Sequence, residues 1–252
     1  MLQHKLLQIS SRDRVIGLSN STSDFTVNMN NIDGLQKVKS VVLKHATIPN
    51  VFYNISSLDG NNVFTYNIAG TPGSFTVPEG QYSVADFLVA LDLAGVAIGL
   101  VSTFDTVTSK LSFTTTTNIE WLDLNDGNAM AEVLGIKYGT GSGADVGSYA
   151  AQGMVGLEGV RNVYIESVQL GEANLLRSNN TTTSTLAVVP ITVPFLGIEH
   201  YTSQHADIDD VDSVSRRYGK NIQSVSIKLL DHDGHVLDLQ GHHFSMVVKI
   251  YF

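Results

Sequence analysis

The chain has no cysteine, so it can form no disulfide, no thiolate metal site and no cysteine nucleophile. Charged residues are scarce, at 15% of the 252 residues, where about a quarter is usual. No apolar run approaches the ~20 residues of a transmembrane helix, and the first residues lack the apolar core of a signal peptide. These absences exclude thiol chemistry. They also favour a protein that is neither inserted in a membrane nor secreted.

The charge that is present is mostly negative, with a formal net charge of −9. A nucleic-acid-binding protein needs a basic face for phosphates, so the net charge argues against direct nucleic-acid binding and against adsorption to an anionic membrane. Apolar residues make up 43% of the chain, which is enough for a substantial core. A surface rich in Thr, Ser and Asn but poor in charge suits a protein buried in an assembly. It suits a solitary β-sandwich equally well.

The last 32 residues carry the clearest strand pattern. Val225, Ile227 and Leu229 alternate with polar residues, which is the period of a half-buried strand. A second apolar row runs from Phe244 to Phe252, and Gly234 between the two rows can adopt the positive φ of a hairpin turn. We therefore expect two strands joined by a tight turn. The final strand, 243–252, should lie in the interior of a sheet.

The remaining chain contains further short strand patterns and two helical ones. Ser83 and Asp86 form a good helix start, so residues 83–94 are predicted as the longest helix, with a shorter one at 128–134. A helix between strands would close an open end of a sandwich. About ten short strands separated by turn signals predict an all-β fold, an antiparallel β-sandwich.

Several blocks of the sequence resemble a known family. The C-terminal block resembles a strand, a D-x-x-G-x-x-L-D-L-x-G turn and an aromatic-bearing final strand, and its matching residues are Asp231, Gly234, Leu237, Asp238, Leu239, Gly241 and Phe244. A second block near the start resembles the opening of the same family, with the matching residues Ile9, Ser11, Arg14, Ser21, Ser23, Asp24 and Phe25. A third block resembles the family's next segment and reads Ile48-Pro-Asn-Val-Phe-Tyr-Asn-Ile55. The family is the penton proteins of virophages, polinton-like viruses and large eukaryotic double-stranded DNA viruses.

The resemblance implies a single jelly roll with two short inserted helices and enlarged loops. Its domain layout would be an N-terminal arm at 1–23 and one jelly-roll domain at 24–252, with a loop-rich insertion at about 138–220. Its function would be that of a structural capsid protein, the penton subunit of five-fold vertices in an icosahedral virion. The implied partners are four further copies of the chain, the capsomers of the major capsid protein, and a vertex fibre or minor capsid proteins. Synthesis would occur in the host cytoplasm.

Two other function classes were weighed against the capsid hypothesis. One is a glycan-binding or receptor-binding β-sandwich displayed on a virion, which would need a polar groove with an exposed aromatic residue. The other is an enzyme, but the chain lacks a G-x-S-x-G elbow, a P-loop and a dinucleotide fingerprint. Histidines and aspartates cluster at 200–212, at 231–235 and at 242–243 without a workable ligand spacing. We expect no catalytic residue, metal or cofactor.

The assembly hypothesis points to two long loops, 138–159 and 199–218, as contacts between subunits. The second loop combines an acidic run with two arginines, a pattern that could pair charges across a ring or belong to a solvated loop. The candidate interface residues are Asp207, Asp209, Asp210, Asp212, Arg216 and Arg217.

Overall fold

The computed structural model divides the chain into two compact units. One consists of Met1–Phe52 and Val160–Phe252 and is called here the sandwich unit. The other, Tyr53–Gly159, is called the inserted unit because it interrupts the sandwich unit in sequence. The structure describes residues 4–15, 21–30, 38–117, 119–121, 128–136, 148–176, 182–203, 215–220 and 222–252.

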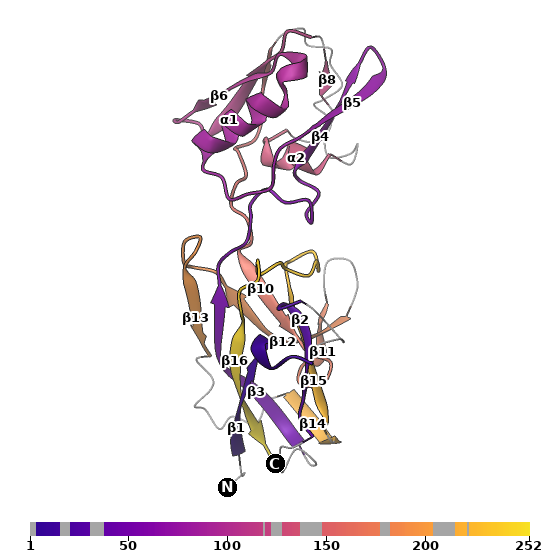
Figure 1. Ribbon diagram of the computed structural model, residues 1–252, viewed down its shortest axis with the longest axis vertical. Helices are drawn as coiled ribbons and strands as arrows, with labels where there is room; N and C mark the ends of the chain where they lie inside the picture. Colours follow the sequence, from indigo (N-terminus) through magenta and orange to yellow (C-terminus); the bar gives the residue numbers. More distant parts are fainter. Residues whose placement is uncertain are drawn as a thin grey trace. The chain divides into compact units, whose positions relative to one another are not determined.

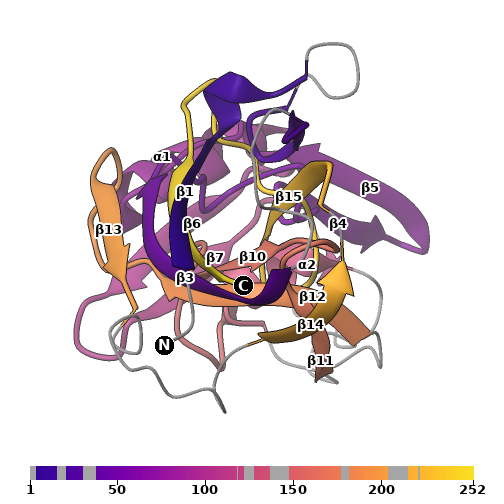
Figure 2. The ribbon, with the colours of Figure 1, turned by 90° about the horizontal axis from the view of Figure 1, so that it is seen from below.

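Two antiparallel sheets form the sandwich unit (Figures 1 and 2). Sheet A contains, in spatial order, β1 (His4–Ser10), β16 (Ser245–Tyr251), β3 (Val38–Pro49) and β13 (Ile198–Thr202), with β14 (Ser215–Lys220) also pairing with β3. Sheet B contains β11 (Glu172–Leu176), β12 (Thr182–Pro190), β10 (Asn162–Glu166), β15 (Ser224–Leu230) and β2 (Asp24–Asn28). Apolar side chains from both sheets share one core, as expected of a β-sandwich.

The pairing of the strands shows a jelly roll. Apart from β11 and β14, the sandwich strands in chain order are β1, β2, β3, β10, β12, β13, β15 and β16. The first of these pairs with the last, the second with the seventh, the third with the sixth and the fourth with the fifth. The chain is thus one long antiparallel hairpin wrapped into two sheets, which is the jelly-roll topology. The predicted fold class is confirmed.

The C-terminal strand lies inside a sheet, as predicted, but it forms no hairpin with the strand before it. β16 is flanked by β1 and β3, and Met246, Val248 and Ile250 are buried. β15 lies in sheet B instead, and residues 231–244 cross from sheet B to sheet A. Gly234 does adopt the expected positive φ of 95°. The expected hairpin is replaced by a crossover because Leu237 and Leu239 are buried in the shared core.

The N-terminal segment belongs to sheet A where the structure describes it. β1 pairs with β16 along its whole length, from His4 opposite Tyr251 to Ser10 opposite Ser245. Ile9 is fully buried in the core, and Leu7 packs against that core. Residues 4–10 are therefore a sheet strand and not the separate arm that the sequence led us to expect.

The inserted unit has its own core and two small sheets. One sheet contains β5 (Thr71–Thr76), β4 (Val63–Ile68) and β8 (Glu120–Trp121), and the other β6 (Val101–Asp105), β7 (Lys110–Thr114) and β9 (Ser148–Ala150). Its described helices are α1 (Val84–Ala94), α2 (Ala129–Val133) and the short 3-10 turn η2 (Val96–Ile98). The sandwich unit contains one described 3-10 turn, η1 (Ser11–Asp13). None of the described helices is long and apolar enough to cross a membrane.

The predicted helix at 83–94 is confirmed, but its role differs from the expected one. The Ser83 hydroxyl accepts the N–H of Asp86, and Gly95 ends the helix. Phe87 and Leu91 are fully buried in the core of the inserted unit, and α1 packs against β6 (Figure 1). The helix therefore belongs to the core of the inserted unit.

The boundaries of the inserted unit also depart from the expected layout. One domain was expected from residue 24, with an insertion at about 138–220, whereas the compact insertion spans 53–159. Within 199–220, β13 and β14 are strands of sheet A. The chain enters and leaves the inserted unit side by side, because the Asn54 amide donates to the Leu157 carbonyl at 3.0 Å and to the Tyr82 carbonyl at 2.9 Å. These contacts lie within the inserted unit, so the segments at its two ends are packed and do not resemble the polar linkers by which sequence marks a domain boundary.

Candidate assembly interface

Of the six predicted interface residues, only Arg216 and Arg217 lie within the described chain, on β14 of sheet A. Asp207, Asp209, Asp210 and Asp212 lie outside the described residues. Arg216 lies on β14 opposite Ser40 of β3, and Arg217 is the next residue; their side chains are also outside the described part of the chain. Pairing between the acidic run and the arginines therefore stays a prediction.

Sheet A is basic although the chain is acidic. Its five strands contain one acidic residue, Glu199, and seven basic ones, in a chain with 24 acidic and 15 basic residues. The five strands of sheet B contain three acidic residues and one basic residue. The basic residues of sheet A are Lys5, Lys39, Lys44, Arg216, Arg217, Lys220 and Lys249. The strands of the two sheets therefore differ in charge, a feature that the net charge conceals.

Strand alternation places part of this charge on the outer surface of sheet A. Because Met246, Val248 and Ile250 point into the core, Lys249 and Tyr251 lie on the other side of β16, where Lys249 is half-buried and Tyr251 is buried. The Lys249 ammonium lies 5.0 Å from the centre of the Tyr251 ring, a cation–π distance, and the His4 ring lies 5.9 Å from the same ring. On the next strand, His45 Nδ1 lies 3.1 Å from the Thr202 hydroxyl. This side of sheet A thus carries cationic and histidine side chains, with the buried Tyr251 ring packed beneath Lys249 and His4.

The acidic residue of sheet A does not neutralise this surface. The buried Glu199 carboxylate accepts the Thr192 N–H at 2.7 Å and the Thr192 hydroxyl at 2.8 Å. Burial raises the pKa of Glu199, but these hydrogen bonds, one from the Val193 N–H and the nearby His200 together outweigh it and lower the pKa. The Glu199 carboxylate therefore holds the turn before β13.

The two most family-like blocks of the sequence meet at one junction in the sandwich unit. The Ser11 N–H donates to the Phe244 carbonyl at 3.0 Å, and the Phe244 N–H donates to the Ser11 hydroxyl oxygen at 3.1 Å. The Arg14 guanidinium donates to the Ser11 carbonyl at 2.9 Å. The rings of Phe25 and Phe244 lie 6.4 Å apart in the core. Ser11, Arg14, Phe25 and Phe244 of the predicted motifs thus fasten the beginning of the chain to its end.

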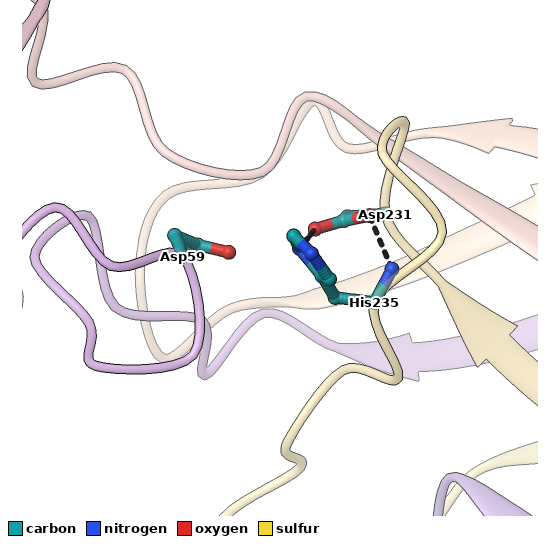
Figure 3. A group of neighbouring side chains, drawn as sticks. All are labelled: Asp59, Asp231 and His235. Atoms are coloured by element: carbon teal, nitrogen blue, oxygen red, sulfur yellow. Dashed lines mark hydrogen bonds and ion pairs between the residues drawn. The ribbon is translucent and has the colours of Figure 1, made fainter. Parts of the chain in front are cut away.

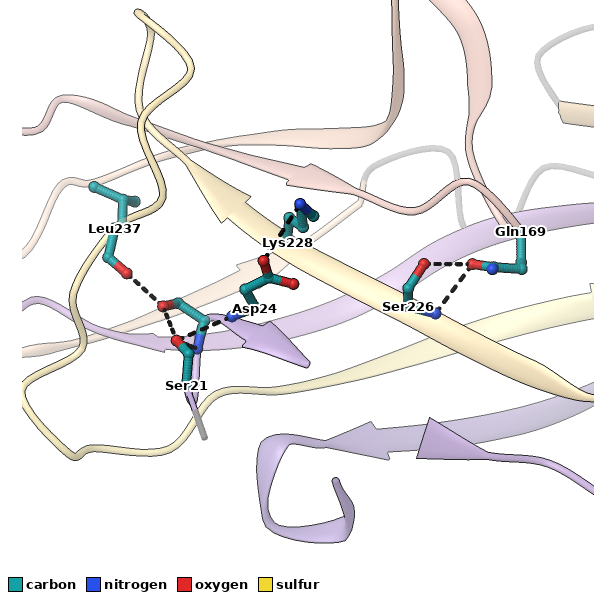
Figure 4. Close-up of polar contacts among 7 residues, drawn as sticks. Ser21, Asp24, Gln169, Ser226, Lys228 and Leu237 are labelled. Carbon is teal, nitrogen blue, oxygen red and sulfur yellow. Dashed lines mark hydrogen bonds and ion pairs between the residues drawn. The ribbon is translucent and has the colours of Figure 1, made fainter. Parts of the chain in front are cut away.

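A second set of polar contacts joins β2, β15 and their neighbours (Figure 4). The buried Ser23 hydroxyl donates to the Leu237 carbonyl and lies 2.9 Å from the Ser21 hydroxyl. Asp24 forms an ion pair with Lys228 at 3.3 Å. Further along β15, the Gln169 side-chain carbonyl accepts both the N–H and the hydroxyl of Ser226. These contacts fix sheet B to the crossover segment.

The crossover is shaped by a buried carboxylate (Figure 3). Asp231 accepts the N–H of Gly234 at 2.6 Å and the N–H of His235 at 2.9 Å, and its second oxygen lies 3.1 Å from His235 Nδ1. A carboxylate that receives backbone N–H groups in this way is a turn cap. The motif residues Asp231 and Gly234 therefore build the bend that takes the chain from sheet B to sheet A.

At the junction of Ser11 and Phe244, a serine lies beside a histidine, but the geometry of this pair argues against nucleophilic catalysis. The Ser11 hydroxyl lies 3.1 Å from His243 Nδ1, but Ser11 is fully buried and its oxygen already accepts the Phe244 N–H. A nucleophile must reach its substrate, and this hydroxyl cannot. Burial, then the charges of Arg12, Arg14 and His242, lower the pKa of His243.

The strand order defines the class of protein as a single jelly roll, here with an inserted unit between its third and fourth strands. Among solved structures, the crystal structure of the mavirus penton protein is similar to this chain, with a TM-score of 0.50 and 13% sequence identity. The similarity covers 99% of this chain and 99% of that one. No family model and no curated protein matches the sequence. The likeness is therefore one of fold along the full length.

Proposed function

We propose that this chain is the penton subunit of an icosahedral double-stranded DNA virus, a structural protein without enzymatic activity. The supporting observation is the fold similarity to the mavirus penton protein over 99% of both chains, which includes the jelly roll and the inserted unit together. The motif residues at the junction of the chain ends add support from sequence. Five copies would close a ring at each vertex, and the localisation would be the virion.

The charge of the two sheets suggests how such a ring closes. In a cyclic ring each copy presents one surface to the copy before it and a different surface to the copy after it. Basic sheet A would meet an acidic surface of the neighbouring copy. The acidic run at Asp207, Asp209, Asp210 and Asp212 would pair with Arg216, Arg217 or another basic group across the ring. Capsomers of the major capsid protein would surround the ring, and a vertex fibre or minor capsid proteins could attach to it.

The decisive experiment is electron microscopy of purified particles with the density assigned by sequence. We expect density for this chain as five copies at each vertex. Density only at other positions, or absence of the chain from purified particles, would refute the proposal.

A charge-reversal variant tests the ring contact separately. Changing Asp209 and Asp210 to Lys should lower particle yield, while the melting temperature of the isolated chain stays unchanged. The matched control reverses two exposed acidic residues elsewhere, Glu132 and Asp233, and should leave the yield unaltered. High salt should loosen assembled rings, because screening weakens exposed charge pairs.

A further inference from the structure

Helix α1 of the inserted unit is apolar on both of its faces. Nine of its eleven residues are apolar, and the only charged ones are Asp86 and Asp92. Phe87 and Leu91 face the core, as expected of a helix that covers a sheet. A helix at the surface of a soluble unit normally carries charged residues on its opposite face. On α1 that face carries valine and leucine.

The exposed side chains form a continuous stripe. Val89 and Leu93 are 71% and 74% exposed, and Val96, in η2 just beyond the helix, is 69% exposed. A spacing of four residues places Val89 and Leu93 on one side of α1, and Val96 follows directly after the Gly95 cap. A single exposed apolar residue is ordinary, whereas three large ones in a row mark an interaction surface. We call these three residues the α1 stripe.

Charge decides what kind of partner can cover the α1 stripe. The inserted unit contains eleven acidic and two basic residues, which gives it a formal net charge of −9. Asp86 and Asp92 on the helix itself belong to this excess. A second inserted unit would bring the same negative charge, so self-association through this face is opposed. An anionic bilayer or a nucleic acid is repelled for the same reason.

We infer that the α1 stripe is the docking site of a different protein, whose contact surface is an apolar ridge bordered by lysine or arginine. Apolar contact would supply the centre of the interface, and the negative field of the inserted unit would steer the basic partner toward it. The inference concerns the inserted unit alone and does not depend on the vertex assignment.

Two synthetic helical peptides test this inference on the full-length chain. Both carry the same leucine pattern at a spacing of three and four residues, and their polar positions are lysine in one and glutamate in the other. Calorimetry at low salt should show binding of the lysine peptide only. Changing Val89 and Leu93 together to Gln should weaken that binding at least tenfold, and Gln keeps a good helix propensity at both sites.

The controls distinguish specific binding at the α1 stripe from non-specific apolar binding. Val107→Gln changes the most exposed valine of the same unit, at 90% exposure on the turn between β6 and β7, and should change the affinity less than twofold. Unchanged melting temperatures show that each variant is folded. Four results would overturn the inference: binding of neither peptide, equal binding of both, self-association that the Val89 and Leu93 changes abolish, or stripe-dependent binding to lipid vesicles.

Discussion

The two units of this chain divide its charge unevenly. The inserted unit has eleven acidic and two basic residues, whereas the sandwich unit has thirteen of each, so the whole net charge of −9 belongs to the inserted unit. All eight histidines lie in the sandwich unit. The sandwich unit is neutral overall but carries a basic sheet, and the inserted unit is acidic throughout. The two units are therefore suited to different partners, and each should respond differently to salt and pH.

This comparison corrects what the net charge alone predicts. An overall charge of −9 disfavours anionic partners for the chain as a whole, yet sheet A holds seven of the fifteen basic residues. The acidity of 53–159 is visible in the sequence, because only Lys110 and Lys137 are basic in that range. It was missed because nothing marked the range as a separate unit. A count by structural unit, instead of by chain, reveals it.

The largest expected effect concerns the independence of the two units. Deleting residues 246–252 removes most of β16, which lies between β1 and β3, so the sandwich unit should fail to fold and the chain should be insoluble. The inserted unit, residues 53–159, has its own core and should fold when expressed alone. Circular dichroism and a cooperative thermal transition would check both. A truncated chain with unchanged melting, or an unfolded 53–159 fragment, would contradict the division.

The next prediction compares two buried phenylalanines, one in each unit. Phe244→Ala and Phe113→Ala each empty a fully enclosed site, so each should lower the free energy of unfolding of its own unit by about 3–5 kcal/mol. Trp121 is the only tryptophan and lies in the inserted unit, so its fluorescence reports that unit alone. Phe244→Ala should shift the dichroism transition and leave the fluorescence transition in place. A shift of both transitions by Phe244→Ala would show that the units unfold together.

A smaller effect separates two turn-capping aspartates. Asp231 is buried and caps the crossover of the sandwich unit, whereas Asp105 caps the exposed turn between β6 and β7 by accepting the Val107 N–H at 2.8 Å. Asp231→Ala removes the acceptor of two partly buried N–H groups and should cost about 1–3 kcal/mol. Asp105→Ala should cost less, because water can satisfy the freed N–H group. Chemical denaturation of both variants gives the comparison, and equal losses would contradict it.

Sequence reading located most strands but not their partners. Alternation at Val225, Ile227 and Leu229 identified β15, and the row from Phe244 identified β16, because burial on one face imposes a period of two. Alternation does not predict which sheet a strand joins. For that reason β15 and β16, which are neighbours in sequence, were expected to pair with each other. Asp231 and Gly234 correctly indicated a bend. Whether a bend closes a hairpin or crosses a sandwich depends on long-range packing by Leu237 and Leu239.

The candidate site was predictable only in part, for a related reason. Arg216 and Arg217 were selected by their local charge and do belong to the basic sheet, but Lys44 and Lys249 come from strands far away in sequence. Their convergence follows from the jelly-roll order, which no local pattern contains. The α1 stripe was likewise hidden, because the helical pattern of residues 83–94 is apolar on both sides and does not reveal which side is covered.

The smallest expected effect is a difference in pH dependence between the units. Burial, then the charges of Arg12, Arg14 and His242, lower the pKa of His243 from its ordinary value of 6.5, so the folded sandwich unit binds this proton less readily than the unfolded chain. Its stability should therefore be full above about pH 6.5 and decline as the pH falls through that value.

The inserted unit has no histidine. Its lowered carboxyl pKa values belong to Glu79, through hydrogen bonds from Ser57, and to Asp105, through hydrogen bonds from Thr108 and Val107.

Because of Glu79 and Asp105, the stability of the inserted unit should respond to pH only at lower pH values than that of the sandwich unit. A depressed carboxyl pKa stabilises the fold above the unfolded value, 4.5 for Glu79 and 3.8 for Asp105, and that contribution is lost only below it. Between about pH 7 and about pH 5.5 the dichroism transition should move to lower temperature while the Trp121 fluorescence transition stays constant. His243→Gln should flatten the first response. A fluorescence transition that follows the dichroism transition in this range would show that the histidines of one unit also govern the stability of the other.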